Sequence, residues 1–230
     1  MRMTEAITSR TYDIWSGVYD KTFGKLVHRR QVRALHQFNL KPGDRVLDIG
    51  VGTGMMLIHY PRDVEVVGLD LSAGMLNKAE DKRRELKLSH CHLIRGDAMF
   101  PPFAEASFDH VMVSHTISVV SDPQKLRNWA IRLVKPGGRI VLLNHFQSTN
   151  PVIAWFEKVL NPVLVKIGWR SDLSLEEVIR NCDAHVEYSF KMRMIDVWRI
   201  VVMRQGKAPL SQPAHPEDLP ANAVHHLPVS

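Results

Sequence analysis

A short acidic and glycine-rich segment, Asp48-Ile49-Gly50-Val51-Gly52-Thr53-Gly54, completes an apolar run that begins at Arg45. Glycines at such a junction let the backbone turn tightly and let a ligand approach main-chain N–H groups. The dinucleotide fingerprint is Gly-x-Gly-x-x-Gly, whereas the third glycine here comes one residue earlier. Such a loop can serve NAD, FAD or S-adenosylmethionine. Asp48 favours the last, because a carboxylate repels a pyrophosphate and attracts the ammonium group of a methionine moiety.

Two further acids follow the next two apolar runs. Asp70 ends the run Glu65–Asp70, twenty residues past Gly50, where a carboxylate can accept hydrogen bonds from both ribose hydroxyls. Asp97, within Arg95-Gly96-Asp97-Ala98, is placed to accept a hydrogen bond from an adenine amino group. The three acids therefore predict a site for an adenosyl ligand that carries an amino group.

The elements that must position these acids alternate along the chain. Strands are expected at 45–50, 65–70, 91–95, 108–115 and 139–145. Helices are expected at 53–60, 73–85 and 125–133, the second with Ser72 as its N-cap. This alternation predicts an α/β fold with a mostly parallel sheet, helices on both faces and ligands beyond the carboxyl ends of the strands.

The flanking segments extend this fold. Residues 10–38 carry apolar side chains at helical spacing and predict an amphipathic helix, and residues 151–180 are also expected to be helical. Two strands around residues 186–204, expected as an antiparallel edge pair, bring the sheet to seven strands. We therefore expect an N-terminal helical segment over 1–40, the main domain over 41–205, and a disordered tail over 206–230, which is rich in Pro, Ala and His.

Residues 45–145 resemble the class I S-adenosylmethionine-dependent methyltransferases, which have a Rossmann-like fold. The resemblance rests on the glycine loop, the acid after the second strand, the Gly-Asp-Ala segment, and Lys135-Pro136-Gly137-Gly138 before the fifth strand. It implies S-adenosylmethionine as cofactor, S-adenosylhomocysteine as product, and no metal. The cofactor-binding residues it implies are Asp48, Gly50, Gly52, Gly54, Asp70, Leu71, Met75, Gly96, Asp97, Ala98 and Ser114.

The acceptor of the methyl group must be inferred from other parts of the chain, because this fold serves many acceptors. Segments 12–20, 115–123, 144–148 and 168–173 are similar to the bacterial, Rhodobacter-type phosphatidylethanolamine N-methyltransferases. The similarity implies stepwise methylation of phosphatidylethanolamine and its methylated derivatives towards phosphatidylcholine. The expected substrate-binding residues are Tyr12, Trp15, Thr116, Trp169 and Arg170. A quinone C-methyltransferase, a small-amine N-methyltransferase and a non-catalytic protein that binds S-adenosylmethionine or a membrane remain open.

Charge and composition bear on partners and location. The net charge of +6 favours an anionic partner, and the basic helix expected over 10–38 predicts contact with an anionic membrane surface. Nucleic acid is not expected, since no Asn-Pro-Pro-Tyr-like segment follows the fourth strand. The chain shows neither a signal-peptide h-region nor an apolar run long enough to span a membrane. We expect a cytoplasmic protein attached peripherally to the inner membrane, and we make no prediction of its oligomeric state.

Methyl transfer from a sulfonium to an amine requires alignment and an amine that has lost a proton. His115 and His145 fall at the carboxyl ends of expected central strands, and Tyr19 lies in the expected N-terminal helix. These three are the predicted catalytic residues. Each histidine has the alternative of binding the lipid phosphate or being structural, and Tyr19 has the alternative of packing the helix against the core.

Overall fold

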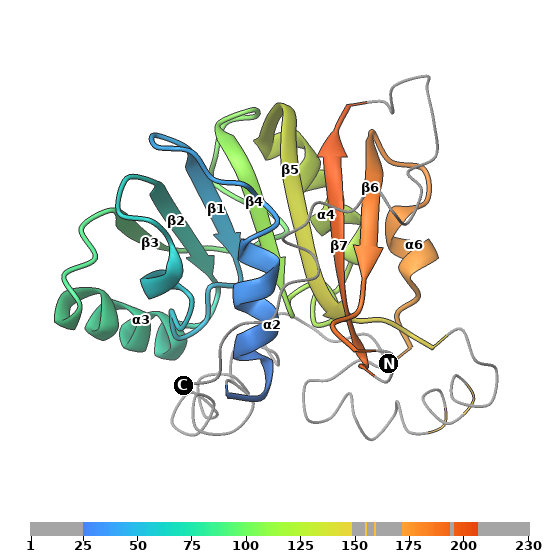
Figure 1. The fold of residues 1–230 in the computed structure, drawn as a ribbon, viewed down its shortest axis with the longest axis horizontal. Coiled ribbons are helices and arrows are strands. Elements are labelled where there is room, and N and C mark those ends of the chain that lie inside the picture. The colour runs from blue at the N-terminus through green and yellow to red at the C-terminus, as the bar shows by residue number, and fades with distance from the viewer. Residues whose placement is uncertain (1–24, 149–154, 156–158, 160–171, 194–195, 207–230) are drawn as a thin grey trace.

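The computed structural model describes residues 25–148, 155, 159, 172–193 and 196–206. Its centre is a seven-stranded sheet in the order β3-β2-β1-β4-β5-β7-β6 (Figure 1). The strands are β1 (Arg45–Ile49), β2 (Glu65–Asp70), β3 (Cys91–Arg95), β4 (Phe108–Ser114), β5 (Val134–His145), β6 (Ala184–Phe190) and β7 (Trp198–Gln205). The first five pair in parallel, and β7 pairs antiparallel with both β5 and β6. The predicted fold class, with its antiparallel edge pair, is confirmed.

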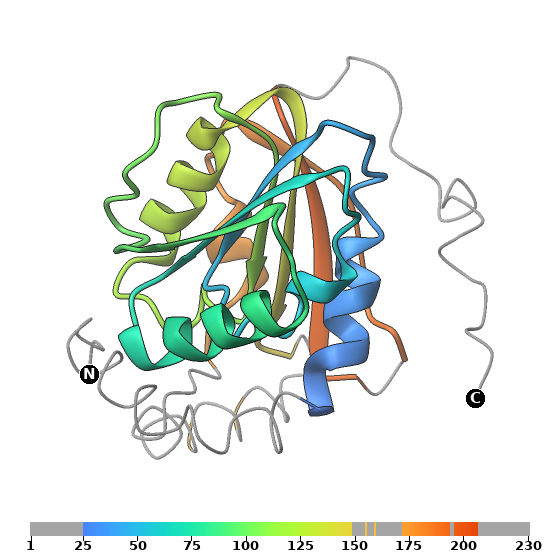
Figure 2. The same cartoon turned by 90° about the vertical axis from the view of Figure 1, so that its left-hand side faces the viewer.

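Helices cover both faces of the sheet. Helices α2 (Lys25–Leu35) and α3 (Ala73–Glu85) contribute to one hydrophobic core, which also contains strand side chains such as Val46 and Met112. Helices α4 (Pro123–Leu133) and α6 (Leu175–Ile179) contribute to a second hydrophobic core, which contains strand side chains such as Leu47 and Val111. Figure 2 shows α2 and α4 on opposite sides of the sheet. Because side chains alternate along a strand, Asp48 lies on the face that α2 and α3 cover.

Local signals in the sequence set several element boundaries. The hydroxyl of Ser72 accepts the backbone N–H of Met75 at 3.1 Å, so Ser72 is the N-cap that the sequence predicts for α3. Asp122 caps α4 in the same way, with Pro123 in the first turn. The helix expected at 125–133 therefore begins two residues earlier, because proline is well tolerated at a helix start.

The helix predicted over 53–60 is wrong. The structure has only a single 3₁₀ turn there, η2 (Leu57–His59). Two features prevent a longer helix. Gly52 and Gly54 have positive φ angles of 58° and 71°, and Pro61 disfavours helical geometry at the residue before it. Tyr60 accordingly has an extended backbone, with φ −74° and ψ 134°.

The predicted N-terminal helix is confirmed only for its last part, α2. Val27, Ala34 and Leu35 of this helix are buried in the core of the domain, so α2 covers the sheet. Residues 1–24 and the 207–230 part of the expected tail lie outside the described residues. Within the described ranges, no helix is both long and apolar enough to cross a membrane.

Candidate active site

The glycine loop turns sharply at the carboxyl end of β1. Gly50 has a φ of 78°, and its N–H donates to the carbonyl of Leu69 at 2.7 Å, which holds the loop against β2. A Cβ on Gly50 would lie 1.9 Å from the hydroxyl of Thr116. At Gly52, by contrast, the nearest atom to a Cβ would be 4.0 Å away. Gly50 therefore meets a crowded protein interior, whereas Gly52 leaves open space for a ligand.

The carboxylate of Asp70 fastens this loop to α3. Its Oδ2 accepts the N–H of Gly52 at 2.8 Å, and its Oδ1 accepts the N–H of Ser72 at 2.9 Å. The acid predicted after the second strand thus lies directly beside the glycine loop.

The remaining predicted cofactor residues lie at the neighbouring strand ends. Gly96 donates its N–H to the carbonyl of Asp70 at 2.9 Å, and Asp97 accepts the N–H of Met99 at 2.7 Å. Met75 is buried on the first turn of α3. Leu71 and Ala98 are partly exposed at the same edge of the sheet. Loop ends from β1, β2 and β3 therefore meet where the adenosyl ligand is expected.

Asp48 is a buried acid that lines a pocket together with residues of the glycine loop. Asp48 is only 3% exposed, and its Oδ2 accepts a hydrogen bond from the hydroxyl of Tyr60 at 3.0 Å. Burial is the main cause that raises the pKa of Asp48 from 3.8 to about 7. The hydrogen bond from Tyr60 lowers this pKa, and the charge of Asp70 raises it further. A cation brought into the pocket would favour the ionised form.

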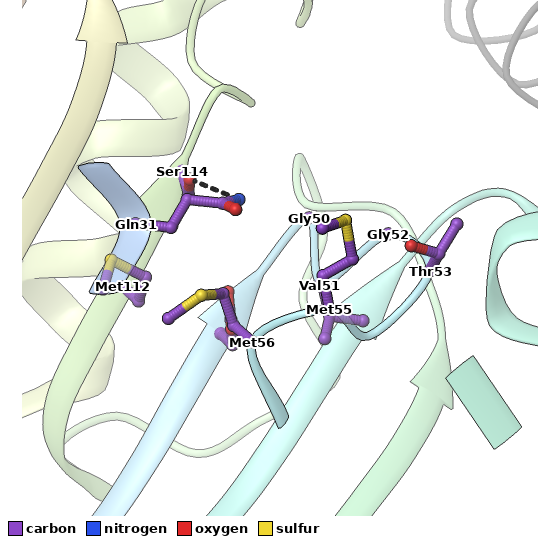
Figure 3. Close-up of a pocket in the computed structure, with 10 residues that line it drawn as sticks. Gln31, Gly50, Val51, Gly52, Thr53, Met55, Met56, Met112 and Ser114 are labelled. Atoms are coloured by element: carbon purple, nitrogen blue, oxygen red, sulfur yellow. Dashed lines mark hydrogen bonds between the residues drawn. The ribbon is translucent and has the colours of Figure 1, made fainter. Parts of the chain in front are cut away.

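Figure 3 shows the pocket between β4, the glycine loop and α2. Its lining includes the predicted residues Asp48, Gly50, Gly52 and Ser114. It also includes residues that the sequence did not single out, which are Gln31, Val51, Thr53, Met55, Met56 and Met112. The Nε2 of Gln31 donates to the hydroxyl of Ser114 at 3.2 Å. Helix α2 thus contributes a polar side chain to this pocket.

One sequence signal could have found Gln31. It lies four residues after Val27 and four before Leu35, which are both buried. Residues with this spacing share one face of a helix, so Gln31 is a polar residue on the buried face of α2. No comparable signal marks Tyr60, whose contact with Asp48 depends on the 3₁₀ turn that replaces the predicted helix.

The two predicted catalytic histidines have different surroundings. His115 follows β4 with a φ of 58°, and its ring lies edge-on to Trp198 with centroids 6.4 Å apart. Burial, and then the charge of Arg30, lower the pKa of His115 to about 3. His145 ends β5, and its Nδ1 lies 2.9 Å from the carbonyl of Val197. Because a carbonyl only accepts, Nδ1 carries the proton and Nε2 carries the lone pair when this ring is neutral.

Thr116, predicted to bind substrate, is close to the glycine loop. Its hydroxyl lies 3.1 Å from the carbonyl of Ile49 and 3.0 Å from that of Ser114. These contacts make Thr116 a support for the loop in addition to any contact with substrate. Five other predicted site residues lie outside the described residues, namely Tyr12, Trp15, Tyr19, Trp169 and Arg170.

An ion pair connects α2 to the start of β7 near His115. The guanidinium of Arg30 lies 2.9 Å from the carboxylate of Asp196, whose side chain is 2% exposed. The same guanidinium lies 4.4 Å from the ring centroid of Trp198. Helix α2 is therefore held at two places, at the pocket through Gln31 and at the antiparallel edge of the sheet through Arg30.

The donor set fits an S-adenosyl ligand. A buried carboxylate and an open glycine backbone line one pocket, and the acid at the end of β2 bonds the same glycine loop. These groups match an ammonium group, a close-lying thioether chain and a ribose. In the described part of the chain, no three His, Cys, Asp or Glu side chains come together as a metal-binding group. The fold is that of a doubly wound α/β protein with a buried acid in a pocket at the carboxyl end of its sheet.

Comparisons with known proteins define the family more closely. Residues 47–142 match the methyltransferase domain family. A phosphatidylethanolamine N-methyltransferase of Cereibacter sphaeroides is 36% identical over 74% of this chain and 83% of its own length. A demethylmenaquinone methyltransferase of Oceanobacillus iheyensis is 32% identical over 58% of this chain and 59% of its own length. The chain belongs to the class I S-adenosylmethionine-dependent methyltransferases, and its resemblance to the Rhodobacter-type phospholipid enzymes is confirmed.

A solved structure supports the fold. The geranyl diphosphate C-methyltransferase of Streptomyces coelicolor, in complex with S-adenosyl-L-homocysteine, matches with a TM-score of 0.62. The match covers 77% of this chain and 76% of that one, at 15% identity. At this identity the likeness concerns the fold alone.

Proposed function

We propose that the protein transfers methyl groups from S-adenosylmethionine to the amine of phosphatidylethanolamine, stepwise towards phosphatidylcholine. The observation that carries this proposal is the 36% identity to a phosphatidylethanolamine N-methyltransferase across 83% of that enzyme. The similarity to the demethylmenaquinone methyltransferase covers a smaller part of both chains. Methylation of a quinone is therefore the second candidate, and a small amine is a third acceptor consistent with the fold.

The cofactor supplies a methyl group already activated on a sulfonium, so this chain's residues must bind, orient and handle one proton. Asp48 is proposed to hold the ammonium group of the methionine moiety, and Asp70 the ribose hydroxyls. Asp97 is proposed to accept from the adenine amino group. Gly52 supplies the open backbone beside which the ligand lies. These assignments follow from the positions of the carboxylates at three adjacent strand ends.

Attack by the amine requires a proton acceptor. Of the two predicted catalytic histidines, we propose His145 as the acceptor, because its Nε2 carries the lone pair in the neutral ring. His115 is a poor base, since a pKa of about 3 gives it little tendency to take a proton from an ammonium group. We propose that His115 contributes as a neutral ring beside Trp198, and that Tyr19 contributes from the N-terminal segment.

The membrane is proposed to be reached through basic and apolar side chains of the N-terminal segment and of residues 151–169. On α2, Arg29 is exposed, whereas Arg30 lies in the ion pair with Asp196. Each Lys or Arg near an anionic surface contributes about 1 kcal/mol to attachment. We propose peripheral attachment to the inner face of the membrane, where the lipid substrate resides.

The test is incubation of the purified protein with radiolabelled S-adenosylmethionine and phosphatidylethanolamine liposomes, followed by chromatography of the extracted lipids. Label in mono-, di- and trimethylated lipid supports the proposal. The variant Asp70→Asn should abolish labelling, whereas Asp63→Asn, at an exposed turn position, should not. If wild type and the Asp63→Asn variant both bind the cofactor but neither produces labelled lipid, the phospholipid assignment is contradicted.

A further inference from the structure

The contact between Asp48 and Tyr60 joins two residues that are each only 3% exposed. The hydroxyl of Tyr60 lies 3.0 Å from Oδ2 of Asp48. Asp48 also lines the cofactor pocket, whereas Tyr60 belongs to the hydrophobic core behind it. Tyr60 therefore bonds the acid of the glycine loop without itself lining the pocket.

Several titratable groups face this carboxylate from the surrounding elements. Asp70 at the end of β2 opposes its ionisation, and Tyr60 after η2 favours it. Cys91 on β3 also interacts with Asp48, but burial raises the pKa of this thiol to about 12, so it stays neutral. Burial likewise raises the pKa of Tyr60 well above its usual value, so the phenol remains a donor. Tyr60 is thus the group that offsets the effects of burial and Asp70 on Asp48.

We propose that Tyr60 is a positioning residue whose hydrogen bond favours the ionised form of Asp48 and holds its carboxylate at the pocket, so that a ligand with an α-ammonium group binds in a pH-dependent manner. This inference rests on the cofactor assignment of the proposed function and is independent of the methyl acceptor. Protonated Asp48 has lost the charge that attracts the ammonium group. Affinity then follows the ionised fraction of Asp48 and falls about tenfold for each pH unit below its pKa.

Removing the phenol hydroxyl should move the midpoint of this titration. A hydrogen bond to a charged group is about twice as strong as one to a neutral group, so the hydroxyl of Tyr60 stabilises ionised Asp48 more than protonated Asp48. Its loss in Tyr60→Phe should therefore raise the pKa of Asp48, and move the midpoint of the titration from about pH 7 to about pH 8. The variant then binds about tenfold more weakly than wild type at pH 6, about fivefold more weakly at pH 7, and almost equally at pH 8.5.

Calorimetric titration with S-adenosylhomocysteine at these three pH values measures the effect without any lipid. The amino group of the ligand is itself titratable, and the ratio of variant to wild type at each pH removes that contribution. Tyr188→Phe is the matched control, because its hydroxyl donates to the neutral Oε1 of Gln37 at 3.1 Å. The ratio for this control should stay near one throughout.

A second ligand separates a charge effect from a packing effect. An adenosyl thioether of the same length without the α-amino group should bind wild type and Tyr60→Phe equally at every pH. A pH-independent ratio for S-adenosylhomocysteine, or an equal loss with both ligands, would overturn the role of Tyr60. If wild type fails to bind S-adenosylhomocysteine at all, the cofactor assignment itself is wrong, which is a different outcome from failure of lipid methylation.

Discussion

Gly50 provides the most quantitative test of how the cofactor loop is built. Its φ of 78° is a conformation that residues with a Cβ rarely adopt. A Cβ there would lie 1.9 Å from Oγ1, 2.9 Å from Cβ and 3.0 Å from Cγ2 of Thr116. The substitution Gly50→Ala must therefore strain the backbone and displace Thr116, whose hydroxyl contacts the carbonyls of Ile49 and Ser114.

Gly137 separates these two costs. It has the same φ of 78°, but nothing lies within 4 Å of the position that a Cβ would occupy. Gly137→Ala should cost about 1 kcal/mol, since backbone strain of about 1–2 kcal/mol is partly offset by the less flexible unfolded chain. Gly50→Ala adds overpacking of about 1–3 kcal/mol and a lost hydrogen bond of about 1 kcal/mol. We expect a total of about 3–5 kcal/mol.

Urea unfolding followed by tryptophan fluorescence measures both losses of stability, and titration with S-adenosylhomocysteine measures binding. Gly50→Ala should lose binding even where it remains folded, whereas Gly137→Ala should bind like wild type. In a double-mutant cycle, Thr116→Gly should recover at least about 1 kcal/mol of the loss at Gly50. Equal losses of stability for the two glycine variants would refute the steric argument.

Three further predictions concern the residues around the pocket. Gln31→Leu should weaken S-adenosylhomocysteine binding several-fold, whereas Gln37→Leu, which removes a contact outside the pocket, should change stability only; calorimetry distinguishes these effects. Asp48→Asn should stabilise the ligand-free protein at pH 8 by roughly 2–4 kcal/mol while abolishing binding. Because the pKa of Asp48 is raised to about 7 on folding, the protein loses stability as pH rises from about 4 to 7, so the gain should be near zero in urea unfolding at pH 4. Since burial lowers the pKa of His115 to about 3, the profile of kcat/KM between pH 5 and 9 should be free of any inflection from this residue, and an inflection near 6.5 that disappears in His115→Asn would contradict that environment.

Much of this fold followed from local sequence signals. The runs at 65–70 and 91–95 became strands with the expected bounds, because apolar residues bounded by turn signals determine both pairing and burial. Ser72 marked the start of α3 because its hydroxyl satisfies an unpaired helix N–H. The two acids Asp48 and Asp70 came together because parallel strands end at the same edge of the sheet.

Contacts between distant parts of the chain could not be predicted from local sequence signals. Arg30 and Asp196 are separated by 166 residues, and their pairing depends on how α2 lies across the sheet. Gln31 approaches Ser114 for the same reason. The helix predicted over 53–60 was wrong although its residues have helical spacing. Pro61 and the positive φ of Gly54 oppose helical geometry at the two ends of this segment. Tertiary packing and backbone geometry decided these features, and neither is a property of a short sequence window.

The most direct test of the central claim is a competition between acceptors. The protein is given labelled S-adenosylmethionine together with phosphatidylethanolamine and demethylmenaquinone in the same liposomes, and the labelled products are identified by mass spectrometry. The account predicts that methyl groups accumulate on the phospholipid amine, in mono-, di- and trimethylated forms, at a rate well above that of any quinone product. Label confined to menaquinone would contradict the phospholipid assignment and leave the methyltransferase fold and its cofactor site in place.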